Sequence, residues 1–491
     1  MMRGNLVLTL LVAMLGGFFF ALFARTPAPH RAPPVVPASS AGVTVATATV
    51  GPSATLSPRS SGGDDPPATP PPPRLARPLR VVALDWALLA AAVKANGGQA
   101  MSAGGSAWAQ DRLEVALAVE GSVEKLENAL ARGGEAARGA DIAVLSLPRF
   151  VASYERLKAL SPVIFFTVGY SDGREVLVAD GKRLGDLPAK GDVELYAGAG
   201  SPAALLGLFA MDQSGVSPDR IRLVDDGKKA AWAAVPRTEM KGEQGQTKGN
   251  LLLSTGEATH LIPFVAIAQR SMVTEKPEVL RAFVNGWLAG QQGVARDASG
   301  IARTMVHLEG APEPLEVLAA LGQMRPASLR DNARALGLAG RGAATLDRLF
   351  TRSWALWRQA KVLTIPPEQA PIDGRIVGAL IRDGGDLEGP EVPKPAIERP
   401  DTRGDPLLVR RLPGKLDEAH ALEELGFLAA VFARSPIRVG VHPGYRIDVA
   451  KTDALLAQAN ERFDLDADRV TRTDARPQPG TAVTIEVMPI P

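Results

Sequence analysis

Ile142-Ala143-Val144-Leu145-Ser146 is a short, uninterrupted apolar run that ends in a serine. A run of this length without polar alternation is typical of a strand buried on both faces. Similar runs recur along the chain, at Leu79–Leu84, Leu113–Ala118, Val163–Val168, Val176–Ala179, Val193–Ala197, Ile221–Val224 and Leu251–Leu253. Helical patterns lie between them, as at Val123–Ala131 and Ala203–Met211. Strands that alternate with helices predict an α/β fold with mostly parallel pairing.

The chain becomes mainly helical after Pro277. Two segments place large apolar residues three and four positions apart, which is the spacing of one helix face. We expect both faces to point into the core. Their residues are Leu280, Phe283, Val284, Trp287 and Leu288 in the first segment, and Leu346, Leu349, Phe350, Ser353, Trp354 and Trp357 in the second.

Residues 382–405 are rich in glycine, proline and charge, which predicts a linker between two domains. Residues 406–491 then form a small unit of alternating strands and helices. The expected strands are Leu407–Val409, Ile437–Val441 and Val483–Val487, and the expected helices are Leu416–Ala433 and Ala450–Phe463.

The N-terminal segment, residues 1–26, contains an apolar run from Leu6 to Ala24, with Arg3 before it and Arg25 after it. About 20 apolar residues in a helix can span a bilayer, so we expect an uncleaved anchor with the rest of the chain exported. A cleaved signal is the alternative, because Ala21-Leu22-Phe23-Ala24 fits a cleavage site. Residues 27–78 are rich in proline and small residues, which is typical of an extended linker.

The composition excludes several classes of function. The 491 residues contain 55 Lys+Arg against 53 Asp+Glu, so no overall basic field attracts nucleic acid. Cysteine is absent, which excludes disulfides, thiolate nucleophiles and cysteine-based metal sites. The five histidines show no short ligand spacing, and no paired-carboxylate or Ser/His/Asp pattern occurs. We therefore expect no metal, no cofactor and no catalytic residues.

Residues 79 to about 295 resemble the nitrate/sulfonate/taurine-type solute-binding proteins of ABC importers, a group that includes thiamine-precursor binders. The similarity lies in the order and spacing of several segments, namely Gly139–Val144, Gly169–Ala179, Leu184–Leu187, Ala199–Pro202, Gly215–Ile221 and Ile262–Phe283. The resemblance implies a two-lobed α/β fold of the periplasmic-binding-protein kind (type II) over residues 79–381. Lobe two would span about 169–264, and the lobes would close over a ligand in the cleft.

The expected cleft lies where the strands end, because open α/β sheets bind ligands outside the carboxyl ends of their strands. We predict that Trp86, Ser146, Ser171, Gly200 and Ser201 line it. Gly200-Ser201-Pro202 predicts a helix N-terminus, which can hold an anion. Simple capping by Ser201 and simple packing of Trp86 are the alternatives. Arg149 and Arg174 could pair with an anion, but our interpretation is that both are solvated surface residues.

One departure from the family pattern of the solute-binding proteins leaves the identity of the ligand open. The family often presents an aromatic-x-Pro motif in lobe two, whereas this chain has Ala231–Pro236 followed by a polar insert, Lys241–Gln246.

The C-terminal unit resembles OmpA-like domains in Ile437–His442, Asp466–Val470 and Val483–Val487. Pro443-Gly444 and Ala454 stand where that family has its peptidoglycan-binding residues, so a small α+β interaction module is the alternative, and cell-wall association would be weak.

These observations favour a binding protein of the cell envelope that captures a small anionic solute for an ABC permease or for sensing. It would lie in the periplasm, held in the inner membrane by its N-terminal helix. Two alternatives stay open. One is a structural, peptidoglycan-associated envelope protein whose binding fold has lost its ligand. The other is a thiamine-precursor biosynthetic enzyme on the same fold.

Overall fold

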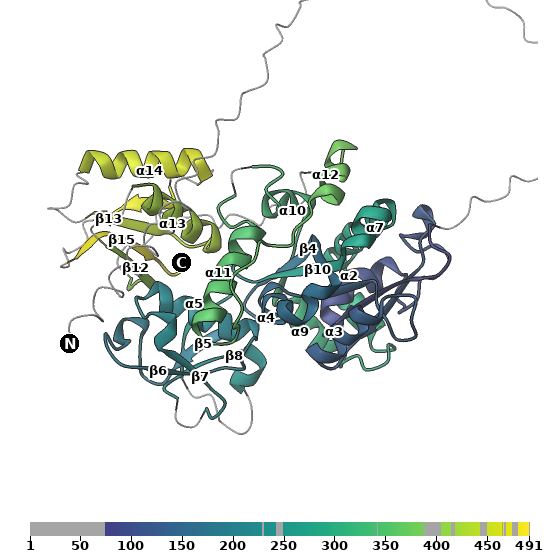
Figure 1. Ribbon diagram of the computed structural model, residues 1–491, viewed down its shortest axis with the longest axis horizontal. Helices are drawn as coiled ribbons and strands as arrows, with labels where there is room; N and C mark the ends of the chain where they lie inside the picture. The colour runs from purple at the N-terminus through teal and green to yellow at the C-terminus, as the bar shows by residue number, and fades with distance from the viewer. Residues whose placement is uncertain are drawn as a thin grey trace, which may run out of the picture. The chain divides into compact units, whose positions relative to one another are not determined.

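A computed structural model describes residues 74–490, apart from residues 228–229, 242–248, 341, 386, 388–403, 414–417, 442–448, 464, 466–467 and 474–479 (Figure 1). The described residues belong to one compact unit, Pro70–Pro491. The expected anchor Leu6–Ala24 lies outside the described residues, as do most of the proline-rich linker, the polar insert and Pro443-Gly444. Among the described helices, none has the length and apolarity that crossing a membrane requires.

Lobe one is built on a sheet whose described strands follow the order β11-β4-β10-β3-β1-β2. β1 pairs in parallel with β2 and β3, whereas β10 runs antiparallel to β3 and β4, and β11 runs antiparallel to β4. The strands are β1 Leu79–Ala83, β2 Val115–Val119, β3 Ile142–Ser146, β4 Pro162–Ser171, β10 Pro263–Gln269 and β11 Met324–Pro326.

Lobe two is built on a second sheet whose described strands follow the order β7-β6-β8-β5-β9. β6 pairs in parallel with β7 and β8, whereas β5 runs antiparallel to β8 and β9. The strands are β5 Glu175–Ala179, β6 Val193–Tyr196, β7 Ile221–Val224, β8 Trp232–Pro236 and β9 Asn250–Ser254.

The two sheets repeat one pattern of connection. The chain passes from lobe one to lobe two between β4 and β5, and it returns between β9 and β10. In each sheet, the first strand after a crossing runs antiparallel to both of its neighbours: β10 lies between β3 and β4, and β5 lies between β8 and β9. The two-lobed α/β fold of type II expected from the sequence is therefore confirmed, and the two crossings, called the hinge below, are the connections between β4 and β5 and between β9 and β10.

Helices cover both sheets, and their starts follow local capping rules. Asp85, Ser122, Ser146, Ser201, Asp297, Ser328 and Thr345 each accept a hydrogen bond from the first turn of a helix. The helices are α2 Trp86–Ala95, α3 Val123–Arg132, α4 Leu147–Leu157, α5 Pro202–Gln213, α6 Arg270–Glu275, α7 Pro277–Arg296, α8 Ala298–Met305, α9 Pro314–Leu321, α10 Leu329–Ala335, α11 Leu346–Gln359 and α12 Arg375–Arg382.

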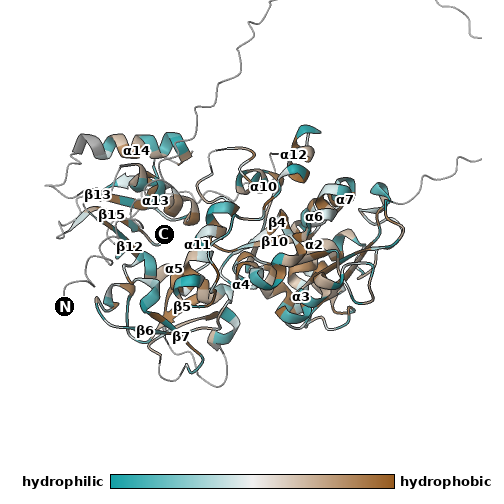
Figure 2. Ribbon diagram, viewed as in Figure 1, coloured by the Kyte–Doolittle hydropathy of each residue, from teal (hydrophilic) through white to brown (hydrophobic). Residues whose placement is uncertain are grey.

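The apolar faces expected on two helices are buried. Leu280, Phe283, Val284 and Trp287 of α7 are buried, and Leu288 is partly buried. All six residues expected to face inward from α11 are buried as well. Figure 2 shows the hydrophobic residues on the inner strands and on the inward sides of the helices.

The C-terminal unit, described here over residues 404–490 with gaps, has its own sheet, with described strands in the order β12-β15-β13-β14. β13 pairs in parallel with β14 and antiparallel with β15. Its elements are β12 Leu408–Pro413, α13 Glu418–Val431, β13 Ile437–Val441, α14 Val449–Phe463, β14 Val470–Arg472 and β15 Thr481–Val487. The linker at 382–405 and the OmpA-like assignment stay predictions.

Candidate functional site

A cleft of about 850 Å³ lies between the two lobes. Lobe one lines it with the loop after β1, the first turn of α4 and the end of α9. Lobe two lines it with the first turn of α5 and the end of β8, and the first crossing contributes two charged residues. The cleft therefore lies at the carboxyl ends of the central strands, as the fold predicts.

Two of the five residues predicted to line this cleft do so, namely Ser146 and Ser201. Trp86 is 4% exposed, and its indole Nε1 donates to the backbone oxygen of Glu309 at 3.2 Å. Ser171 is buried at the first crossing. Gly200 is buried with φ of +73°, a backbone conformation that favours glycine. Trp86, Ser171 and Gly200 are thus not among the residues that line the cleft.

The two serines cap helices whose N-termini face the cleft. The hydroxyl of Ser146 accepts from the backbone N–H of Arg149 at 3.4 Å, at the start of α4. The hydroxyl of Ser201 accepts from the backbone N–H of Ala204 at 3.1 Å, at the start of α5. Each helix start carries a partial positive charge, so both favour an anion in the cleft.

Arg149 is a positively charged residue that lines the cleft. It occupies the third position of α4 and is half-buried. Across the described part of the chain, its guanidinium forms no hydrogen bond or ion pair. Burial, together with the neighbouring Arg174, lowers the pKa of Arg149 from its usual value. The surroundings of Arg149 therefore disfavour its charged form, and an anion bound next to the guanidinium would stabilise that form.

Arg174, at the first crossing, is already paired. Its Nη2 donates to Oδ2 of Asp85 at 2.7 Å, and its guanidinium carbon lies 5.8 Å from the centre of the Phe264 ring. Burial opposes the charge, but Asp85 and Glu175 raise the pKa of Arg174. Asp85 also caps α2, because its Oδ1 accepts from the backbone N–H of Leu88 at 3.0 Å. This second hydrogen bond restrains the carboxylate that pairs with Arg174. The interpretation of Arg149 and Arg174 as solvated surface residues is wrong, because both are partly buried and line the cleft.

The two crossings are joined by a buried polar cluster beneath the cleft. The hydroxyls of Ser171 and Thr255 lie 2.7 Å apart, and the Ser171 hydroxyl also donates to the carboxylate of Glu175. Thr255 further accepts from the backbone N–H of Gly173 at 3.0 Å. Burial raises the pKa of Glu175, an effect that Arg174 opposes. The hydroxyl of Ser171 is therefore used within the protein, where the two crossings meet.

The sequence held one signal for Arg149. Acidic residues favour the first turn of a helix, whereas α4 has none there and carries an arginine instead. Such a local conflict is typical of a functional position. Among the described residues, no group of three or more histidine, aspartate or glutamate side chains could hold a metal ion.

No protein-family model matches the sequence, and no curated protein matches it. Solved structures resemble the fold. The aliphatic sulphonate-binding protein SsuA of Escherichia coli is 12% identical, with a TM-score of 0.42 and coverage of 60% of this chain and 94% of that one. The nitrate-binding protein NrtA of Synechocystis PCC 6803 is 12% identical, with a TM-score of 0.41 and coverage of 62% and 94%.

A Candida albicans gene product, described as having the generic periplasmic binding protein structural fold, is also similar. It is 12% identical, with a TM-score of 0.38 and coverage of 62% of this chain and 95% of that one. These likenesses concern the fold alone.

Proposed function

We propose that this chain is a solute-binding protein that holds a small anion between its lobes, and that it is not an enzyme. The observation that carries the proposal is the guanidinium of Arg149, which faces the cleft without a hydrogen bond or ion pair to any described residue. A partly desolvated charge is costly unless it is paired. A bound anion would supply the missing partner.

The guanidinium of Arg149 favours a ligand with one compact negative group. Arg174 is paired with Asp85, and the carboxylate of Glu175 accepts from the Ser171 hydroxyl of the hinge cluster. Of the two arginines that line the cleft, Arg149 is therefore the one available to a ligand. The α5 N-terminus at Ser201 would face the same group with its backbone N–H donors. Ser146 and Ser201 would then be N-cap residues beside the anion, and the ligand body would occupy the rest of the cleft.

The cellular role rests on the sequence. If Leu6–Ala24 anchors the chain, the cleft lies outside the cytoplasm, where a captured solute can pass to an ABC permease or be sensed. Sulfonate and nitrate, the ligands named for SsuA and NrtA, supply the first probes.

The test is a thermal-shift and calorimetric screen of nitrate, sulfate, alkanesulfonates, taurine and small carboxylates. A ligand present at 100 times its Kd should add about 2.7 kcal/mol to the free energy of unfolding. Arg149→Gln should weaken that ligand by roughly 10–100-fold, because hydrogen bonds to charged groups contribute about 1.5–3 kcal/mol. Arg149→Lys should retain part of the affinity.

Arg132→Gln is the matched control, since it removes an equal charge from an exposed position at the end of α3. It should leave the affinity unchanged. An anion that binds equally well to the Arg149→Gln variant would contradict the site. A screen in which no anion stabilises the parent chain would favour the structural envelope protein instead.

A further inference from the structure

The C-terminal unit contacts both crossings of the hinge. Arg434 forms a two-pronged ion pair with Asp172 of the first crossing, with nitrogen–oxygen distances of 3.1 and 3.3 Å. The backbone N–H of His260, in the second crossing, donates to the backbone oxygen of Val431 at 3.2 Å. Asp172 in turn donates its N–H to the oxygen of Gln323, which lines the cleft. A single short segment at the C-terminal end of α13, residues 431–434, therefore contacts both crossings.

The same unit also packs directly on lobe two. Phe209 of α5 lies 6.4 Å from Phe427 and 6.2 Å from Phe432, measured between ring centres. Arg410 of β12 donates to the backbone oxygen of Asp212 at 3.1 Å. These contacts hold the last turns of α5, whose first turn faces the cleft at Ser201.

Lobe one is reached through α11. Arg352 of α11 pairs with Glu424 and lies 4.0 Å above the ring of Phe427. Further along α11, Trp357 donates its indole Nε1 to the backbone oxygen of Pro148 at 3.1 Å. Pro148 precedes Arg149 in the first turn of α4. The C-terminal unit is thus connected to the element that carries the cleft cation.

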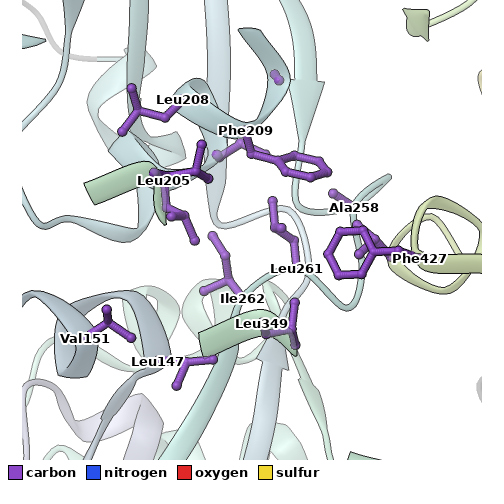
Figure 3. Close-up of a cluster of buried hydrophobic side chains, with 14 of the residues drawn as sticks. Leu147, Val151, Leu205, Leu208, Phe209, Ala258, Leu261, Ile262, Leu349 and Phe427 are labelled. Atoms are coloured by element: carbon purple, nitrogen blue, oxygen red, sulfur yellow. The ribbon is translucent and has the colours of Figure 1, made fainter. Parts of the chain in front are cut away.

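Figure 3 shows where these connections meet. Leu147 and Val151 of α4, Leu205 and Phe209 of α5, Leu261 and Ile262 of the second crossing, Leu349 of α11 and Phe427 of α13 belong to one buried cluster. A rotation of one lobe against the other about the crossings must shift these side chains against one another. Packed cores resist such continuous deformation.

We propose that the C-terminal unit is an intramolecular clamp, docked on the hinge, on α5 and on α11, which sets the angle between the lobes and thereby the affinity of the cleft. Arg434 is its positioning residue at the hinge. Anything that pulls the C-terminal unit away would change the angle without touching the ligand. Coupling between two sites of this kind typically changes affinity by about 5–150-fold. The proposal does not depend on which solute binds.

The absence of cysteine allows a direct test, because two introduced cysteines would be the sole attachment sites for spin labels. Asn128→Cys on α3 and Glu194→Cys on β6 place labels at exposed positions of lobe one and lobe two. Electron–electron resonance on the full chain then reports the distance between the lobes. We expect Arg434→Gln and Asp172→Asn each to broaden or displace that distribution, and the double variant to do no more than either.

Two variants separate the clamp from a merely stabilising contact. Arg434→Lys keeps the charge opposite Asp172 and should restore the parent distribution. Arg411→Gln removes an exposed charge from β12 of the same unit and should leave the distribution unchanged. If Arg434→Gln does not fold, Arg352→Gln tests the α11 contact in its place and should also displace the distribution. Variants that lose stability while the inter-lobe distance stays that of the parent overturn the proposal.

Discussion

The two ends of α5 meet surfaces of opposite character. Its first turn, at Ser201, faces a polar cleft that also contains Arg149. Its last turns lie in an apolar contact, where Phe209 is 1% exposed between Phe427 and Phe432. Under the proposed function, one helix serves recognition at its first end and rigid packing at its last. A substitution near the cleft should change binding, whereas one near the C-terminal unit should change stability and the geometry of the hinge.

The arginine side chains are paired with carboxylates at the hinge, whereas the cleft contains an arginine without such a partner in the described part of the chain. At the hinge, Arg434 is paired with Asp172 and Arg325 with Asp331. At the cleft, the guanidinium of Arg149 has no such partner among the described residues. The ion pairs of the first region form within the folded chain, whereas the proposed anion would supply the missing partner in the second.

The largest effect should come from Phe209. Phe209→Ala removes a fully packed ring that contacts two aromatic residues of the C-terminal unit. We expect a loss of about 3–5 kcal/mol in the free energy of unfolding, measured by denaturant titration. Phe209→Leu is the matched control and should cost less than about 1.5 kcal/mol. A small loss for Phe209→Ala would mean that the contact between α5 and the C-terminal unit is loose.

A second effect should appear on acidification. Burial, and then the neighbouring Arg325, lowers the pKa of His260 to about 3. Arg434 and Arg469 lower this pKa further, whereas Asp331 raises it. The unfolded chain binds a proton at about pH 6.5, so stability falls as the pH drops from there towards 3. Between pH 7.5 and pH 5 the loss from this group should be about 2 kcal/mol.

His260→Gln is the control for that loss. A glutamine can still accept from Arg325, whose Nη2 lies 2.8 Å from the histidine Nε2, but it does not titrate. Denaturant titrations at both pH values should therefore show a flatter pH dependence for the variant. An equally steep dependence in both chains would mean that His260 is not the group responsible.

The smallest effect concerns the capping serine of α5. Ser201→Ala should cost about 1 kcal/mol of stability without ligand, because the hydroxyl no longer accepts from Ala204. Ser201→Gly should cost only a few tenths of that, since glycine is a good cap. Should the hydroxyl also bond the anion, both variants will lose affinity in calorimetry. If both bind as the parent does, Ser201 is a cap alone.

Much of the fold could be predicted because its signals are local. Buried strands such as β3 are continuous apolar runs, and helices such as α5 begin at a serine followed by proline. Three strands gave no such signal. β8 is alanine-rich and ends in proline, while β11 and β14 have three residues each, so pairing partners elsewhere in the chain decide their conformation.

The site was harder to predict because it is assembled from two lobes. Ser146 and Ser201 could be found from strand ends and helix starts. The burial of Arg149 and Arg174 depends on the elements that face them, which no local pattern specifies. Ser171 was expected in the cleft for its place at the crossing, yet its hydroxyl is used by Glu175 and Thr255.

The most direct test of the anion site is anomalous diffraction from crystals of the full chain soaked in selenate, whose selenium marks the anion. We predict a peak within hydrogen-bonding distance of the Arg149 guanidinium, facing the N-terminus of α5 at Ser201, and no such peak in crystals of Arg149→Gln. A cleft that stays free of selenate, at concentrations that raise the melting temperature of the chain in solution, would contradict the account.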